Sequence, residues 1–330
     1  MRNIVLSCWA ALGLATVLSL GGCSADQALE QLLQGDRTGS GGVTTSVPSQ
    51  ADRPRLPSNP TDSISIASFN IQVFGQSKMN KTDVVDVLVK VIRRFDVVAV
   101  QELRAKDQTI VPQFVELLNS EGRAYDYVVG PRLGRTSSKE QYVYLYDTQR
   151  VELTPGSVYT VDDKSDLLHR EPLVASFRTR GPTPGKDFSF TLINIHTDPD
   201  ETDTELDALD DVYRKVQQRN RNEDDVILLG DLNVDERHLG ELGRLPNISW
   251  VIAGIPTNTR GTKSYDNIVF ESGSTVEYTG NAGVFDLAQE YGLTEEEALE
   301  VSDHLPVWAV FHSTEGTSGR LATAGETAIR

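Results

Sequence analysis

Two histidines give this sequence its clearest potential for acid–base chemistry, and each stands at one end of an apolar run. His304 lies in the segment Ser302–Val307 (SDHLPV), directly before the apolar run Val307–Phe311, and His196 follows another such run. Imidazole titrates near neutral pH, so two histidines in one site could serve as general acid and general base. Taken alone, the His304 segment is equally compatible with a turn, because serine, aspartate and proline all favour turns.

Carboxylates and amides stand at the ends of other apolar runs, and such groups are seldom buried without a function. The residues that could ligate a metal ion are Glu102, Asn70, Asp231, Asn233 and Asp303. Oxygen ligands suit Mg²⁺, Mn²⁺ or Ca²⁺, and Mg²⁺ also pairs naturally with substrate phosphate, whereas zinc prefers more nitrogen or sulfur. Each residue alone has an ordinary structural explanation, such as an Asx turn at Asn233. Their common placement at strand ends favours one shared site.

Many short strands are needed to position these side chains, and the hydrophobic pattern predicts them. Predicted strands span 63–70, 97–100, 125–129, 142–146, 151–159, 173–177, 188–195, 226–229, 248–252, 267–270, 276–279 and 307–311. Helical spacing predicts helices over 84–95, 111–118 and 204–220. Strands with interspersed helices, but no regular βαβ series, predict an α+β fold with two packed sheets and helices outside. Strand ends gathered at one rim of these sheets would bring the polar residues together.

The composition excludes one class of nucleic-acid-binding protein. The 330 residues carry 31 basic and 48 acidic side chains, a formal charge of −17. Bulk basicity therefore cannot drive tight, salt-dependent DNA binding. An enzyme that holds phosphate locally, with a few arginines and a metal ion, remains compatible with this charge.

The N-terminus predicts export. Residues 1–22 combine a positive start, a short apolar centre and small residues, as secretory signals do. The sequence Leu20–Cys23 (LGGC) resembles a bacterial lipobox, which implies lipidation of Cys23 after cleavage. The alternative is an uncleaved membrane anchor. Because Cys8 would leave with the signal, the mature chain would have no cysteine available for a disulfide.

The remainder of the chain predicts a tethered domain. Residues 23–62 are rich in Gly, Ser, Pro and Gln and predict a flexible tether. Residues 63–313 form the predicted folded domain, and 314–330 a polar C-terminal tail. We therefore predict an exported lipoprotein of the bacterial cell envelope, bound to a membrane through lipid on Cys23. Ser24, in place of aspartate, is compatible with sorting to an outer membrane or the cell surface.

Six motifs in the predicted domain resemble, in the same order, those of the endonuclease/exonuclease/phosphatase family. They are Ala67–Ile71, Val100–Leu103, Ile193–His196, Gly230–Asn233, Tyr265–Val269 and Ser302–Val307. Within that family, Pro131–Arg135, Tyr142–Tyr146 and Arg170–Val174 most resemble the deoxyribonuclease I group. The resemblance implies a four-layer αββα sandwich and metal-dependent phosphodiester hydrolysis. It favours nonspecific endonucleolytic cleavage of DNA outside the cytoplasm.

The resemblance also implies a role for each catalytic residue. His304, oriented by Asp266, would take a proton from the attacking water. His196, supported by Glu140, would protonate the leaving 3′ oxygen. Asp231 and Asn233 would belong both to the catalytic set and to the metal site. The neighbouring carboxylates Glu102 and Asp303 would face the metal and phosphate.

DNA would be contacted through its backbone or minor groove by Arg104, Arg135 and Arg170, with little sequence specificity. Ser138 stands where the deoxyribonuclease I group carries a tyrosine that packs against DNA, so groove contact should differ. The segment Val161–Leu168 is shorter than that group's calcium-binding loop, which argues against structural calcium there, although Asp162, Asp163 and Asp166 remain available as ligands. Two other hypotheses remain open. The same fold could act on phospholipid head groups or sugar phosphates, or it could be an inactive surface-binding module.

Overall fold

The structure is a computed structural model that describes residues 61–182, 185–219 and 223–316. The predicted signal peptide (1–22), Cys23, nearly all of the predicted tether and most of the predicted tail lie outside the described residues. Within the described part of the chain, no helix is both long and apolar enough to cross a membrane.

The first sheet has six strands. In spatial order they are β12 (Tyr278–Val284), β13 (Val307–His312), β1 (Ser63–Phe74), β2 (Val97–Leu103), β4 (Gln141–Asp147) and β3 (Tyr125–Val129). Strands β1 and β2 are parallel, and the other neighbouring pairs are antiparallel. Every residue of β2 and β4 is buried. The two strands therefore have near-continuous apolar sequences, as expected of strands covered on both faces.

The second sheet has seven strands, also mostly antiparallel. Its main path runs β10 (Ile248–Trp250), β11 (Asp266–Glu271), β9 (Val226–Asp231), β8 (Ser189–His196), β7 (Leu173–Thr179) and β5 (Val151–Leu153), and β6 (Tyr159–Thr160) pairs with β7. Strands β8 and β9 form its one parallel pair among these strands. The predicted single strand over 151–159 is wrong. The chain turns at Gly156, whose φ of 75° is left-handed, and so divides the segment into β5 and β6.

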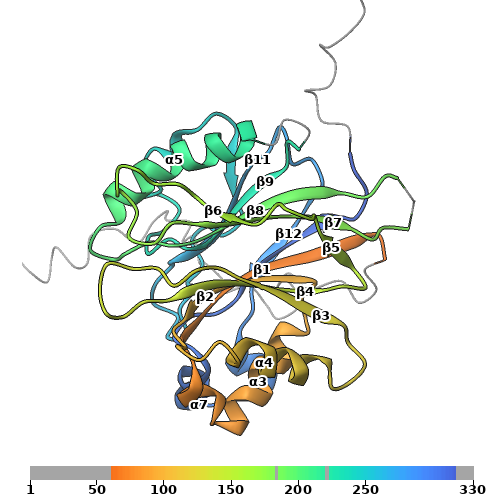
Figure 1. Cartoon of the computed structure of the whole chain (residues 1–330), viewed down its shortest axis with the longest axis vertical. Helices are drawn as coiled ribbons and strands as arrows, with labels where there is room; N and C mark the ends of the chain where they lie inside the picture. The colour runs from red at the N-terminus through yellow and green to blue at the C-terminus, as the bar shows by residue number, and fades with distance from the viewer. Residues whose placement is uncertain (1–60, 183–184, 220–222, 317–330) are drawn as a thin grey trace, which may run out of the picture. The chain divides into compact units, whose positions relative to one another are not determined.

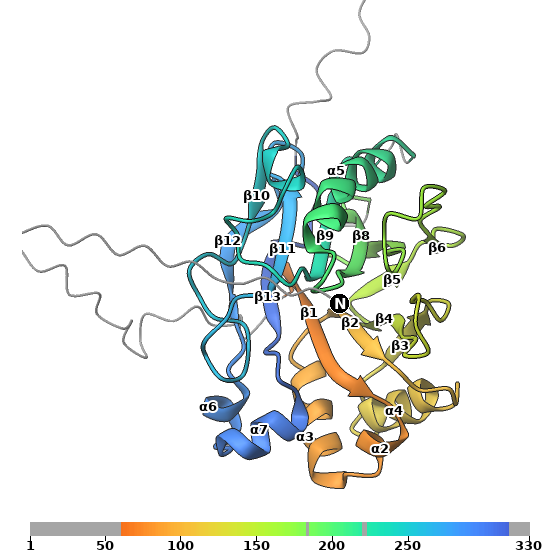
Figure 2. The ribbon, with the colours of Figure 1, turned by 90° about the vertical axis from the view of Figure 1, so that its left-hand side faces the viewer.

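Helices cover the outer face of each sheet (Figures 1 and 2). The first sheet carries α2 (Gln76–Met79), α3 (Thr82–Ile92), α4 (Ile110–Asn119), α6 (Leu287–Tyr291) and α7 (Glu295–Val301). The second sheet carries α5 (Thr202–Arg219) and the short 3₁₀ helix η1 (Leu242–Arg244). A separate apolar cluster fills the space between the sheets. The predicted α+β fold and its four layers, helix–sheet–sheet–helix, are confirmed.

The apolar spacing explains why the long helices form where they do. In α3, Val84, Leu88, Val91 and Ile92 are buried on one face against the first sheet. These residues recur at the three- and four-residue intervals of an amphipathic helix. The short helices α2, α6 and α7 were not among the predicted elements. For α7 a signal exists, because Thr294–Glu297 forms a capping box.

The strands of both sheets begin or end at two opposite edges of the sandwich, which we call its two rims. The register pairs His196 with Asp231 across β8 and β9, and Asp231 with Asp266 across β9 and β11. One rim therefore collects ionisable residues from neighbouring strands. The other rim holds the first residue of β1, Ser63, opposite the last residue of β13.

Candidate active site

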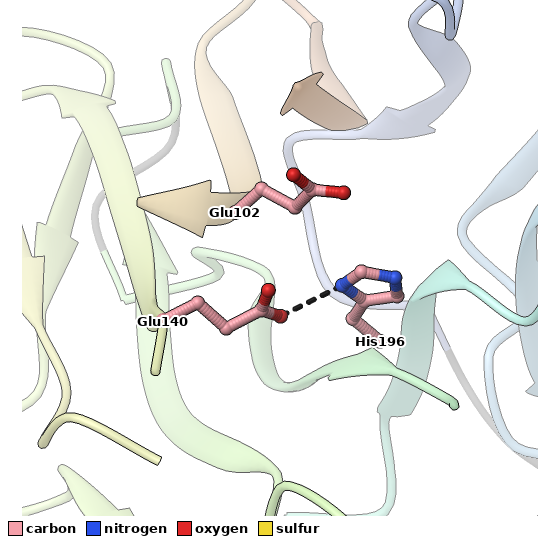
Figure 3. A group of neighbouring side chains, drawn as sticks. All are labelled: Glu102, Glu140 and His196. Carbon is pink, nitrogen blue, oxygen red and sulfur yellow. Dashed lines mark hydrogen bonds and ion pairs between the residues drawn. The ribbon is translucent and has the colours of Figure 1, made fainter. Parts of the chain in front are cut away.

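Two carboxylate–histidine pairs face each other at the first rim. His196 Nδ1 lies 2.7 Å from Glu140 Oε1, and His304 Nδ1 lies 2.9 Å from Asp266 Oδ2. In each pair the carboxylate fixes the ring orientation and leaves the other nitrogen, Nε2, for chemistry. Both Nε2 atoms lie 3.5 Å from the same atom, Asp231 Oδ2. The two imidazoles therefore converge on one point. Figure 3 shows the His196–Glu140 pair beside Glu102.

The Gly230–Asp231 sequence explains how Asp231 reaches that point. A Cβ atom on Gly230 would lie 1.8 Å from the backbone oxygen of Ile195, and the φ of Gly230 is +157°. Only glycine allows β9 to approach β8 this closely. Asp231 follows directly, is 1% exposed, and accepts a hydrogen bond from Asn233 N at 3.0 Å. The strand packing thus fixes the carboxylate between the two histidines.

The Asn70 side chain lies beside Asp231 and has one polar atom without a hydrogen-bond partner. Asn70 is fully buried on β1, and its Nδ2 donates to Asp231 Oδ2 at 2.9 Å and to Glu102 Oε1 at 3.3 Å. Its Oδ1 is buried and has no hydrogen-bond partner among the described residues. Glu102 has a left-handed φ of 63°, a strained conformation that commonly marks functional sites. The donor set Asn70, Glu102 and Asp231 therefore fits a divalent cation with oxygen ligands.

Two groups of ligand atoms at this rim are close enough to hold a metal ion. One comprises Glu102, Glu140 and His196, and the other Asp231, Asp266 and His304; within each, one atom per residue lies within 4.8 Å of the others. The predicted ligands Asn233 and Asp303 lie at the margin. Asn233 Nδ2 donates to the Thr197 backbone oxygen at 2.9 Å. The side chain of Asp303 is 47% exposed, and its Oδ1 lies 4.0 Å from His304 Nε2.

The local charges favour protonated histidines. Burial by itself lowers the pKa of His304, but Asp266 and Asp231 outweigh burial and raise the pKa to about 10. Burial likewise opposes charge on His196, whereas Glu140 and Asp231 raise its pKa above the ordinary value. For Glu140, burial favours the neutral acid, but His196 and Arg170 hold the carboxyl pKa below its usual range. The site thus contains excess negative charge that a cation would offset.

Arg170 is part of the buried support of the His196 pair. Its side chain is 8% exposed, and its Nε lies 3.1 Å from Glu140 Oε1. The guanidinium also donates to the backbone oxygens of His196 at 2.9 Å and Thr197 at 2.8 Å. These contacts occupy the planar fork that an arginine would use to bind phosphate. The burial of Arg170 favours a positioning role over direct DNA contact.

The other two predicted DNA-contacting arginines are more accessible. Arg104 Nη2 lies 3.0 Å from Glu102 Oε2, with one third of its side chain exposed. It also donates to Ser138 Oγ at 3.1 Å. Arg135 pairs with Glu201, and its Nη2 lies 3.3 Å from Asp166 Oδ1. Each of the two side chains is one third exposed, and Arg104 Nε also lies 3.7 Å from Glu140 Oε2, beside the His196 pair.

The segment Val161–Leu168, which the sequence predicts to lack a calcium site, is stabilised by contacts within the chain. Asp163 Oδ2 accepts a hydrogen bond from Leu168 N at 2.7 Å, and Asp166 pairs with Arg135. Neither Asp163 nor Asp166 belongs to a cluster of potential ligands in the described chain. The prediction that this loop lacks structural calcium stays a prediction.

Several residues at the site were not identified from the sequence. Thr257 Oγ1 donates to Asp266 Oδ2 at 2.7 Å and so supports the His304 pair. Asp198 Oδ2 lies 3.3 Å from His169 Nδ1 and 4.0 Å from Arg170 Nη1. Thr257 lies in a loop with no periodicity, so nothing local signals its contact. Asp198 follows His196 by two residues, and that proximity was an available signal.

Comparisons with known proteins agree with this geometry. The profile of the Endonuclease/Exonuclease/phosphatase family matches residues 67–304. Deoxyribonuclease gamma of Rattus norvegicus is 36% identical over 263 residues, covering 74% of this chain and 83% of the rat protein. Deoxyribonuclease-1 of Bos taurus is 34% identical over 263 residues, covering 74% of this chain and 91% of the bovine protein. A family protein from Bacteroides thetaiotaomicron, 16% identical, is similar in fold, with a TM-score of 0.53 and coverage of 75% of this chain and 97% of that one.

Proposed function

The chain belongs to the Endonuclease/Exonuclease/phosphatase family of hydrolases, and on that premise we propose that it cleaves DNA by metal-dependent phosphodiester hydrolysis. The proposed cleavage is endonucleolytic and has little sequence specificity. Relatives at this level of identity are named deoxyribonucleases, which supports DNA as the substrate. Arg104, at the surface beside Glu102, is well placed to meet a phosphate.

One observation carries the proposal: two carboxylate-bound imidazoles present their Nε2 atoms to a single oxygen, Asp231 Oδ2. A general acid and a general base must act on opposite sides of a phosphorus atom during in-line displacement. Two imidazoles that converge on one point can meet this requirement if the phosphate lies between them. Each imidazole has its own orienting carboxylate, so the two can hold different protonation states.

The proton transfers follow from this arrangement. His304 Nε2, in the neutral form that a cation beside Asp231 would favour by offsetting the negative charge, takes a proton from a water molecule as the water oxygen forms a bond to phosphorus. The bond between phosphorus and the 3′ oxygen breaks, and His196 Nε2 donates a proton to that oxygen. The products are a 5′-phosphate and a 3′-hydroxyl, and one water molecule is consumed. Asp266 and Glu140 stabilise whichever imidazole carries positive charge.

Glu102, Asn70 and Asp231 are the residues we propose as the main metal ligands, with Asn233 and Asp303 at the margin. A Mg²⁺ ion bound there, or Mn²⁺ in its place, would supply positive charge that stabilises the charge developing on phosphate. The choice of Mg²⁺ rests on the oxygen ligands and on the affinity of this ion for phosphate. The unpartnered Asn70 Oδ1 supports a cation at this position.

Export and lipidation at Cys23 complete the proposal. They rest on the N-terminal sequence, which resembles a lipoprotein signal. The folded domain starts at the rim opposite the histidines, because Ser63 pairs with His312 at the far end of β13. A tether attached there would leave the histidine rim free for substrate. Labelling with a radioactive fatty acid, compared between the native chain and Cys23→Ala, would test the anchor.

Plasmid nicking tests the proposed activity directly. Supercoiled DNA incubated with the protein and Mg²⁺ should convert to the open-circular form, and EDTA should stop the conversion. Intact plasmid under these conditions would contradict the proposal. A parallel screen with phospholipid and sugar phosphate esters would identify the alternative substrates, if phosphate were released from them and DNA were left intact.

A further inference from the structure

A second cluster of carboxylates lies at the rim opposite the histidines. Asp225 directly precedes β9, Glu277 directly precedes β12, and Glu315 lies three residues after the end of β13. The three residues offer carboxylate oxygens that all lie within 4.8 Å of one another. Because β9 spans six residues, this cluster is about 20 Å from Asp231. It is therefore separate from the proposed catalytic metal site.

The two buried members of the cluster have unmet hydrogen-bonding capacity. Asp225 is 1% exposed and Glu277 is 2% exposed. Asp225 Oδ1 and Glu277 Oε2 have no hydrogen-bond partner among the described residues. Buried polar atoms in native proteins nearly always have a partner, so such atoms call for an explanation, often an ion or a water molecule. Here both belong to carboxylates.

The cluster has little compensating positive charge. In the described part of the chain no lysine or arginine forms an ion pair with Asp225 or Glu277, and Arg178 is a cationic side chain whose charge acts on Glu315. Backbone amides donate to two of the carboxylates, Gly316 N to Glu277 Oε1 at 2.6 Å and Ser189 N to Glu315 Oε2 at 3.2 Å. The side chain of Thr275 interacts with Asp225. A buried carboxylate without a counter-charge is destabilising unless it takes up a proton or binds a cation.

The cluster lies between the two sheets and contains residues from both. Asp225 enters the second sheet at β9, whereas Glu277 and Glu315 flank strands of the first sheet. Backbone contacts already link the sheets at this rim, since Phe188 N donates to Ser313 O at 3.2 Å. A cation shared by the three carboxylates would add a second link between the sheets, and it would bind only when they are correctly packed.

We propose that Asp225, Glu277 and Glu315 form a structural site for a divalent cation of the calcium type, which clamps the two sheets at the rim opposite the active site. Calcium fits because it accepts several carboxylate oxygens in flexible geometry, whereas Mg²⁺ requires near-ideal octahedral geometry and retains water.

Thermal unfolding of the full-length protein, in EDTA and in about 1 mM CaCl₂, tests the site. Calcium should raise the wild-type melting temperature by about 3 °C or more, because a ligand that binds only the folded state stabilises it. Asp225→Asn should abolish this increase. A Mg²⁺ titration at the same concentration should give a smaller increase.

Matched variants separate this site from the catalytic one. Glu102→Gln removes a proposed catalytic ligand and should retain the calcium-dependent increase, whereas Glu102→Gln/Asp225→Asn should lose it. Glu315→Gln changes an exposed carboxylate and should therefore fold even if the Asp225 variant does not. This second variant should weaken calcium binding. An equal calcium response in wild type, Asp225→Asn and Glu315→Gln would overturn the proposal. So would the absence of any calcium response in the wild type. Neither outcome bears on plasmid nicking.

Discussion

Buried carboxylates have different neighbouring side chains at the two rims of this sandwich. At the catalytic rim Glu140 contacts both an imidazole and a guanidinium, and Asp266 contacts an imidazole and a threonine hydroxyl. At both rims each of these buried carboxylates keeps one oxygen without a hydrogen-bond partner among the described residues: Glu140 Oε2 and Asp266 Oδ1 at the first, Asp225 Oδ1 and Glu277 Oε2 at the second. The difference is that Asp225 and Glu277 lie beside further carboxylates instead of an imidazole. Negative charge at the first rim is compensated mainly by side chains that can also transfer or hold protons. At the second rim, compensation must come from a proton or a bound cation.

The comparison teaches that similar clusters can have different uses. Strand β9 has Asp225 just before its first residue and Asp231 at its last, so one short strand contributes to both rims. What differs is the surroundings: histidines lie beside Asp231, and further carboxylates lie beside Asp225. Reactivity therefore follows from the neighbours that tertiary packing supplies.

Replacement of His304 should have the largest effect. His304→Ala removes the proposed base and should reduce plasmid nicking by about 10³-fold. Binding of the catalytic metal should be retained, as isothermal titration with Mg²⁺ would measure. The matched control is His238→Ala, which removes a histidine that is 68% exposed and should leave nicking unchanged. Equal losses in both variants would show that the His304 pair has no special role. Loss of Mg²⁺ affinity in His304→Ala would contradict the division of labour between His304 and Asp303.

Replacement of Arg170 should have the next largest effect. Arg170→Ala frees Glu140 and the backbone oxygens that Arg170 binds, so His196 should lose its fixed orientation. We expect kcat to fall by about 10²-fold with little change in KM for DNA. Arg170→Lys should restore part of kcat, because it retains the charge but not the planar fork. A rise in KM with unchanged kcat would instead indicate direct contact with DNA.

At the rim opposite the histidines, the buried carboxyl group of Glu223 predicts that the free energy of unfolding in EDTA depends on pH. Burial is the main cause that raises the pKa of Glu223 from 4.5 to about 7, with Glu315 and Asp224 contributing. A carboxyl whose pKa is higher in the folded state stabilises the protein fully below pH 4.5. This contribution, roughly 3 kcal/mol, should be lost as the pH rises from 4.5 through 7.

Urea unfolding of wild type and Glu223→Gln between pH 4.5 and 7.5 would measure this effect. The wild-type stability should fall more steeply with pH than that of the variant. Glu121→Gln, at a side chain that is 76% exposed, is the control and should follow the wild type. Parallel curves for wild type and Glu223→Gln would contradict the comparison between the rims.

Arg135 should have the smallest effect. It pairs with Glu201 and Asp166 at the surface, so Arg135→Ala should weaken DNA binding by about threefold at low salt. The slope of log affinity against log salt should also decrease by about one. Arg214→Ala, on the outer helix α5, is the control and should not change either quantity. No change in the salt slope for Arg135→Ala would remove this residue from the proposed DNA-binding surface.

Local signals in the sequence were sufficient for much of the fold. The periodic apolar residues of α3 and the continuous apolar run before Asp231 predicted a helix and a buried strand. Alternation failed at 151–159, because a turn at Pro155–Gly156 interrupts it. Helices α2 and α6 span four and five residues, too few for the spacing of an amphipathic helix to be recognised.

The sequence by itself determined which chemical groups this protein has and where they stand on its strands. The motifs around Asp231 and His304 identified the family, and the register of the strands then follows from which faces are apolar. The pairing of these groups was implied by the family resemblance and not by any local pattern, and the tertiary structure brings each pair into contact. Glu140 and His196 are 56 residues apart, and Asp266 and His304 are 38 apart, so no local pattern could reveal either contact.

The tertiary structure also decided between uses of the same residue type. Arg170 and Arg135 are indistinguishable as sequence signals, yet Arg170 is buried against Glu140 and Arg135 lies at the surface. Asp225 lies in a polar segment before β9 and was not singled out in the sequence, and the tertiary structure brings Glu277 and Glu315 to it from the other sheet. The physical reason is that desolvation and charge pairing depend on distance in space, which the packing of the two sheets sets.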